Sequence, residues 1–118
     1  MQLRFLQKNK EGKDMIIAVA GSGGKTTRVH KLAQYYRSLG KKVFVTTTTH
    51  MKKESDTVIP ENIEDIRKQL NETGYCMAGM PATPENALVQ KIGPLPEDFY
   101  ETAVKEADIT PVSYTHLT

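Results

Sequence analysis

The spacing of apolar and polar residues changes along the first half of the chain, and each spacing predicts a different element. Residues 15–20, MIIAVA, are continuously apolar and rich in β-branched side chains, which is typical of a strand buried on both faces of a parallel sheet. Residues 25–39 place apolar side chains at helical spacing, and Gly40 follows where a left-handed residue would end the helix. Residues 41–50, KKVFVTTTTH, predict a second strand. Strand, helix and strand in succession form a βαβ unit.

The second half of the chain continues the alternation of helices and strands. In chain order we predict a loop at 51–60, a helix at 61–70, a strand at 74–80, a proline-rich segment at 81–96 with a short strand at 88–92, a helix at 97–106 that opens after Pro96, and the start of a buried strand at 107–110. The pattern therefore predicts an α/β fold, with a mostly parallel sheet and flanking helices.

Composition narrows the class of protein without identifying it. The chain has 118 residues, 38% of them hydrophobic and 25% charged, which suits one small globular domain. It contains no apolar run of the roughly 20 residues that span a bilayer, and its first residues lack the apolar core of a secretory signal. Cys76 is the single cysteine and cannot form an internal disulfide. These features lead us to expect a cytoplasmic protein with no membrane partner.

Charge is divided unevenly between the two halves. Residues 1–60 hold 12 Lys and Arg against 4 Asp and Glu, a net charge of +8, whereas residues 61–118 hold 4 against 10, a net charge of −6. A basic half attracts phosphate, either of a nucleotide or of a nucleic acid. A small basic nucleic-acid-binding module is therefore one alternative, although basic and aromatic residues are not interleaved as in an RNA-binding sheet.

The stretch AVAGSGGKTTRVH, residues 18–30, has the chemistry of a phosphate-binding loop between a strand and a helix. Glycines let consecutive backbone N–H groups approach an anion, and the start of a helix adds further free N–H groups. A lysine at this point reaches the β- and γ-phosphates, and the next hydroxyl can bind Mg²⁺. We assign phosphate stabilisation to Lys25 and the metal to Thr26. The whole predicted loop is Gly21, Ser22, Gly23, Gly24, Lys25, Thr26 and Thr27.

The loop is shorter than the common phosphate-binding pattern, because Val19 stands where that pattern has its first glycine. The compact spacing is similar to the loop of the Mur-type amino-acid ligases. An ATP-dependent enzyme of the Mur-ligase or kinase kind that acts on a small molecule is therefore a further alternative.

Four consecutive threonines, residues 46–49, end the second predicted strand. Ligands of open parallel sheets bind outside the carboxyl ends of the strands, so these hydroxyls should lie near the phosphate loop. We assign Thr47 and Thr48 to the nucleotide site, although threonine is also a common strand residue. His30, His50 and His116 are not spaced as a metal set with Cys76, which we interpret as a buried thiol.

The two motifs together resemble the opening of the YqeC family, the selenium-dependent hydroxylase accessory proteins. The resemblance is carried by residues 15–51, in which GSGGKTT stands for the family's GAGGKTT and VTTTTH follows a basic GKKV turn. It implies a P-loop, NTPase-like fold that binds Mg²⁺ with ATP, GTP or CTP. It also implies a role in the maturation of molybdenum hydroxylases, with the hydroxylase or its cofactor as partner. From the loop itself we expect an NTPase or a phosphoryl or nucleotidyl transferase. The non-enzyme alternative is a nucleotide-gated accessory protein that binds a client hydroxylase or its cofactor.

The end of the chain departs from the family's pattern. The family continues from a strand equivalent to ADIT into an acidic motif similar to VEADG, which would supply a carboxylate for Mg²⁺ and water. Here ADIT is followed by PVSYTHLT, and a proline is a poor continuation of a central strand. We therefore expect residues 1–110 to be the N-terminal part of a nucleotide-binding domain and residues 111–118 to be a non-native tail. The alternative is a genuine short C-terminal tail.

Overall fold

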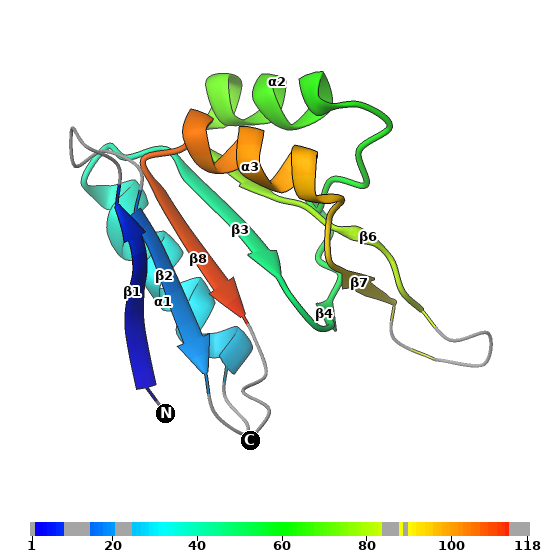
Figure 1. Cartoon of the computed structure of the whole chain (residues 1–118), viewed down its shortest axis with the longest axis horizontal. Helices are drawn as coiled ribbons and strands as arrows, with labels where there is room; N and C mark the ends of the chain where they lie inside the picture. The colour runs from blue at the N-terminus through cyan, green and yellow to red at the C-terminus, as the bar shows by residue number, and fades with distance from the viewer. Residues whose placement is uncertain (1, 9–14, 21–24, 84–87, 89, 114–118) are drawn as a thin grey trace.

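A computed structural model describes residues 2–8, 15–20, 25–83, 88 and 90–113 of the chain. Its main feature is a five-stranded sheet in the order β1-β2-β8-β3-β5 (Figure 1). The strand β1 pairs with β2 in antiparallel register, and the remaining pairs are parallel. The five strands are β1 (Gln2–Lys8), β2 (Met15–Ala20), β8 (Ile109–Ser113), β3 (Val43–Thr47) and β5 (Tyr75–Met77).

Helices cover both faces of this sheet. They are α1 (Lys25–Ser38), α2 (Ile63–Thr73) and α3 (Glu97–Glu106), and Figure 1 shows α1 behind the strands and α3 in front of them. A second, antiparallel sheet of three short strands follows the order β4-β7-β6, formed by β4 (Met51–Lys52), β7 (Lys91–Gly93) and β6 (Met80–Pro81). Among the helices of the described residues, none has the length and apolar character needed to cross a membrane.

The apolar core is divided into two clusters by the main sheet. Val43 and Val45 of β3 belong to a cluster with Val29 and Ala33 of α1, whereas Phe44 belongs to a cluster with residues of α2 and α3. Successive side chains of a strand point to opposite faces, so a central strand that is covered on both faces is apolar at most of its positions. This explains why the apolar runs of the sequence are continuous and confirms the predicted α/β fold with a mostly parallel sheet and flanking helices.

Most of the predicted elements are present near their expected boundaries. The strand at 15–20 and the helix at 97–106 have the predicted bounds, and α1 ends one residue early, at Ser38. Gly40 adopts the left-handed conformation expected of it, with φ of 78°. The strands β1 and β4 were not predicted, and β4 lies inside the predicted loop at 51–60. The predicted strand at 41–50 is shorter at both ends, because β3 begins at Val43 and ends at Thr47.

The last strand corrects one expectation. β8 does not end before Pro111 but continues to Ser113, and all its residues are buried. Pro111 lies opposite Ile17 of β2 in the parallel register. A proline has no N–H to donate, so the sheet loses one potential hydrogen bond there, while the neighbouring residues maintain the ladder. Whether residues 111–118 are native to the protein remains a hypothesis, and residues 114–118 lie outside the described residues.

Candidate functional site

The predicted phosphate loop connects two elements whose ends meet at the carboxyl edge of the sheet. β2 ends at Ala20 and α1 begins at Lys25, so the connection has four residues, as the motif requires (Figure 1). Gly21, Ser22, Gly23 and Gly24 themselves lie outside the described residues, as do the side chains of Lys25 and Thr26. The side chain of Thr27 is exposed.

The start of α1 has the features of an anion-binding helix terminus. The first four N–H groups of a helix have no partner within it, and the helix dipole places partial positive charge there. The first turn of α1 contains no acidic residue, so no carboxylate of that turn competes for these groups. An anion at this end of the sheet would therefore meet free donors and favourable charge.

The threonine run divides into a buried and an accessible part. The hydroxyl of Thr46 donates to the carbonyl oxygen of Ala78 at 2.9 Å, and that of Thr47 donates to the carbonyl oxygen of Ser113 at 2.9 Å. Both residues are buried, and they connect β3 to the neighbouring segments. Thr48 is exposed and Thr49 is half-buried. The accessible hydroxyls are therefore those of Thr48 and Thr49, immediately after the strand.

The buried Thr47 helps to fix the backbone of the accessible residues Thr48 and Thr49. Its hydroxyl oxygen accepts a hydrogen bond from the backbone N–H of Thr49 at 3.1 Å, which folds the chain back after the strand. The backbone N–H of Thr48 donates to the carbonyl oxygen of Ser113 at 2.9 Å. Of the two threonines that the sequence assigns to the nucleotide site, Thr48 is accessible and Thr47 is a buried residue that positions it.

Ser113 is a residue of this edge that the sequence did not reveal. It pairs with Val19 of β2 on one side and with Thr47 of β3 on the other, so it lies between the strand before the glycine loop and the strand of threonines. Its sequence signal was weak, because it follows a proline in a segment that we expected to be a tail. The β-branched residues Ile109, Thr110 and Val112 are the signal that could have extended the strand.

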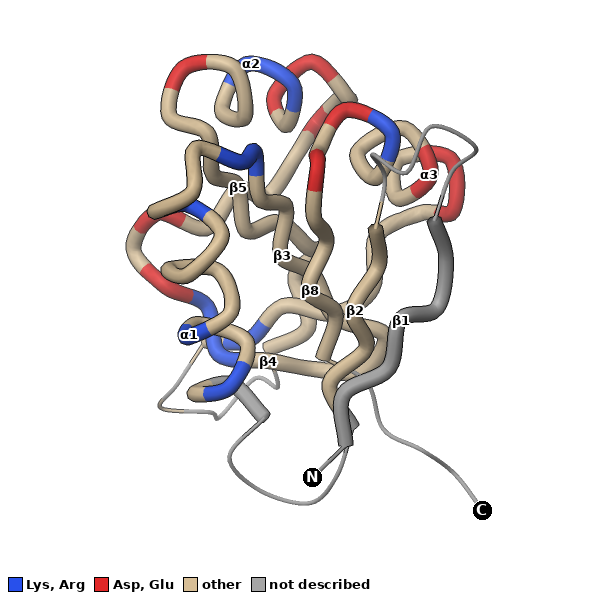
Figure 2. Tube along the Cα trace, turned by 90° about the vertical axis from the view of Figure 1, so that its left-hand side faces the viewer, with Lys and Arg blue, Asp and Glu red and all other residues tan. Residues whose placement is uncertain are grey.

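α1 carries basic residues and no acidic ones, whereas the acidic residues lie on the other elements and on the segment beside this helix (Figure 2). Residues 25–53 contain eight Lys and Arg and no Asp or Glu. Arg28 and Lys31 are exposed on the helix that starts at the candidate site. The basic charge predicted for the first half is thus carried, in part, by the helix that would face a phosphate group.

Asp108, the last acidic residue of the sequence, lies at the amino edge of the sheet and not at the carboxyl edge, where the candidate site lies. Asp108 precedes β8, and its Oδ2 accepts a hydrogen bond from the backbone N–H of Lys42 at 2.9 Å, at the amino edge of the sheet. This carboxylate therefore fixes the starts of two parallel strands and does not reach the carboxyl edge. In the part of the chain that the structure describes, no group of three His, Cys, Asp or Glu side chains could hold a metal ion.

The remaining candidates of the sequence lie away from this edge. Cys76 is fully buried, and burial, with a smaller effect of Asp56, raises the pKa of its thiol to about 12. His50 is exposed. Nε2 of His30 lies 3.4 Å from Oε1 of Glu54. Tyr36 of α1 is partly buried and packs against the core cluster that contains Val29 and Ala33.

Comparison with known proteins gives one match. A family model described as "YqeC protein" matches residues 17–113, from the strand before the glycine loop to the end of β8. No curated protein and no solved structure matches the chain.

Proposed function

Because this chain belongs to the YqeC family, we propose that it binds a Mg²⁺–nucleoside triphosphate at the carboxyl edge of its parallel sheet. We further propose that it acts as an accessory factor in the maturation of selenium-dependent molybdenum hydroxylases. The proposed nucleotide is ATP, GTP or CTP.

One observation carries the proposal: a glycine-rich connection of four residues joins the end of β2 to the start of α1. This order of elements allows the backbone N–H groups of the loop and of the first helical turn to surround a phosphate group. Lys25 would neutralise charge on the β- and γ-phosphates, and Thr27 would lie near the α-phosphate.

The hydroxyl groups near the loop are too few to bind Mg²⁺ alone, so we propose that the ion binds together with the phosphates of the nucleotide. Mg²⁺ prefers oxygen ligands and usually keeps several waters, so phosphate oxygens, water and one hydroxyl can complete its coordination. Thr26 would supply that hydroxyl, and the exposed Thr48 could bind a coordinated water. When bound, the ion would reduce the negative charge of the phosphates.

The site as described suits binding better than rapid turnover. Phosphoryl transfer is promoted by a residue that orients the attacking nucleophile, commonly a carboxylate or an amide. Asp108 lies at the opposite edge of the sheet, where it accepts from Lys42. We therefore propose slow nucleotide turnover that a client hydroxylase stimulates. Stimulation by a small-molecule substrate alone would instead indicate a transferase or ligase.

Calorimetry with Mg²⁺ and each of ATP, GTP and CTP tests the site directly. Lys25→Ala should weaken binding by about tenfold or more, because it removes a charge-assisted contact to phosphate. Lys68→Ala is the control: it removes an exposed lysine of α2 and should leave the affinity unchanged. Equal affinity of the wild-type chain and Lys25→Ala would contradict the proposal.

A further inference from the structure

A polar groove of about 380 Å³ runs along the side of α1. Its volume is within the range of small-molecule sites. α1 forms one wall, the turn at residues 54–56 forms the opposite wall, and Tyr75 at the start of β5 contributes to the lining. The charged and titratable side chains that line it are His30, Arg37, Glu54, Asp56 and Tyr75, and Gln34 and Ser55 add neutral polar groups.

The groove contains a cation and an anion that do not neutralise each other. The guanidinium of Arg37 lies over the ring of Tyr75, with its Cζ 4.7 Å from the ring centroid. Stacking of this kind occupies the face of the guanidinium and leaves its N–H edges able to donate. Within the described ranges, neither Arg37 nor Asp56 has an oppositely charged group within 4.0 Å.

Tyr75 connects these two charges. Burial is the main cause that raises the pKa of its phenol to about 12; the charge of Asp56 also acts to raise it, and that of Arg37 acts to lower it. The hydroxyl is therefore protonated at neutral pH, and it senses the negative charge of Asp56 and the positive charge of Arg37 together. A ligand in the groove would meet both charges and a neutral hydroxyl.

The turn that carries the acidic groups is held in place by its own hydrogen bonds. The backbone N–H of Glu54 donates to Oγ1 of Thr57 at 2.8 Å, and the same hydroxyl donates to Sδ of Met77 at 3.2 Å. Next to it, the backbone N–H of Lys53 donates to the carbonyl oxygen of Gln90 at 2.8 Å. The carboxylates are thus presented by an ordered turn opposite a helix, which lowers the ordering cost of binding.

We propose that this groove binds a small zwitterion of the free α-amino acid class, with its carboxylate at Arg37 and its ammonium group at Asp56. A ligand with both charges can form a favourable contact with each wall of the groove. A simple anion would be repelled by the carboxylates, and a simple amine would be repelled by the guanidinium.

This site is separate from the proposed nucleotide site. Arg37 stands twelve residues after Lys25, and at 1.5 Å per residue the two positions are about 18 Å apart along the helix axis. Binding at the groove therefore does not depend on a nucleotide, and Lys25→Ala should leave it intact.

The test uses the ¹⁵N-labelled full chain and the twenty common L-amino acids, each added separately at about 10 mM, which detects millimolar dissociation constants. We expect at least one of them to shift the amide signals of Gln34, Arg37, Asp56 and Tyr75. For that amino acid, the analogue without the ammonium group and the analogue without the carboxylate should each bind about tenfold more weakly.

Variants of the groove complete the experiment. Asp56→Asn and Arg37→Gln should each weaken the same amino acid by about tenfold, since each removes a charge-assisted hydrogen bond. Lys31→Gln is the control, because Lys31 is exposed on α1 but does not line the groove. The proposal is overturned if no amino acid shifts these signals, if either single-charge analogue binds as well as the parent, or if the two groove variants bind as well as Lys31→Gln.

Discussion

Two buried threonines of the central strands differ in how their hydroxyl groups are satisfied. Thr46 of β3 donates to the carbonyl oxygen of Ala78 at 2.9 Å. Thr110 of β8 is 1% exposed, and its Oγ1 has no hydrogen-bond partner in the described part of the chain. A buried hydroxyl without a partner costs free energy, whereas a bonded one contributes to stability.

Replacing each of these threonines by valine should therefore have opposite effects. Thr110→Val should raise the free energy of unfolding by up to about 1 kcal/mol, because valine has nearly the same shape and no group to desolvate. Thr46→Val should lower it by about 1 kcal/mol or more, because the Ala78 carbonyl loses a donor. Urea unfolding of both variants measures the difference. An equal loss of stability in both would show that Thr110 is satisfied in the folded protein.

The buried phenol of Tyr75 and the buried thiol of Cys76, at the start of β5, should make the free energy of unfolding depend on pH in the alkaline range. Burial is the main cause that raises the pKa of Cys76 from 9.0 to about 12 and that of Tyr75 from 10.0 to about 12. The unfolded chain thus releases these protons at lower pH than the folded chain does. The free energy of unfolding should fall as pH rises from about 9 toward 12, with the full stabilisation present below that window.

Urea unfolding across this pH range measures the contribution of the thiol. Cys76→Ala removes one of the two groups, so its stability should fall less steeply with pH than that of the wild-type chain, whatever its stability at neutral pH. Parallel pH profiles for the two proteins would show that the thiol is accessible to solvent. The sequence predicted a buried thiol at this position, because Cys76 stands among apolar residues.

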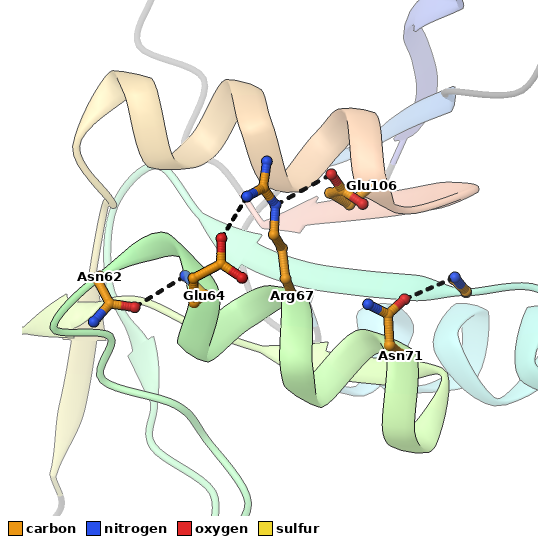
Figure 3. Close-up of polar contacts among 6 residues, drawn as sticks. Asn62, Glu64, Arg67, Asn71 and Glu106 are labelled. Atoms are coloured by element: carbon orange, nitrogen blue, oxygen red, sulfur yellow. Dashed lines mark hydrogen bonds and ion pairs between the residues drawn. The ribbon is translucent and has the colours of Figure 1, made fainter.

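The helix α2 begins with a capping box that fixes its first turn. Oδ1 of Asn62 accepts from the backbone N–H of Glu64 at 3.0 Å (Figure 3). In return, Oδ2 of Asp65 accepts from the backbone N–H of Asn62 at 3.4 Å. Further along, Arg67 forms ion pairs with Glu64 of its own helix and with Glu106 of α3. These contacts satisfy free donors of the helix start and join the two helices.

Loss of the cap should be measurable in the stability of the whole domain. Asn62→Ala should lower the free energy of unfolding by about 1 kcal/mol, because it leaves an N–H of the first turn without its acceptor. Asn71→Ala, later in the same helix, is the control: Asn71 is exposed and accepts only from the exposed amine of Lys42, so about 0.5 kcal/mol or less is expected. Equal losses in urea unfolding would contradict the role of the cap.

At the level of elements, local sequence signals were sufficient where the pattern was long and regular. The apolar run at 15–20 and the helical periodicity of α1 gave nearly the observed bounds. β1 was missed because MQLRFLQK mixes charged and apolar residues, and a strand at the edge of a sheet needs no continuous apolar run. β8 was cut short at Pro111 because proline signals a break locally, although pairing on both sides maintains the strand.

For the whole molecule, the strand order is the feature that the sequence did not predict. β8 is the last strand of the chain, yet it lies between β2 and β3. Such an order depends on pairing between residues far apart in sequence, for which the chain carries no local signal. The same insertion brings Ser113 between Val19 and Thr47. Glycine and threonine motifs could therefore be found from sequence, but the residue between their strands could not.

The central position of β8 gives a test of the architecture as a whole. Val112 is 2% exposed and belongs to the core cluster with Phe44 and Ile16. Val112→Ala should lower the free energy of unfolding by roughly 2 kcal/mol, through lost burial and the cavity that remains.

A variant shortened to end at Thr110 lacks the last three residues of this strand and their pairing with β2 and β3. Since small domains have only about 5–15 kcal/mol of stability, the shortened chain should be largely unfolded or unfold at much lower urea.

Circular dichroism and urea unfolding of the two variants distinguish the alternatives. If β8 continues through Pro111, Val112→Ala is destabilised moderately and the shortened chain severely, in the same order by both probes. If residues 111–113 do not belong to the sheet, both variants keep the wild-type midpoint, and the strand would then end at Thr110. Calorimetry with Mg²⁺ and nucleotide then shows whether Val112→Ala changes the binding site as well as the stability. This variant should stay folded in the absence of urea and bind nucleotide with the affinity of the wild-type chain.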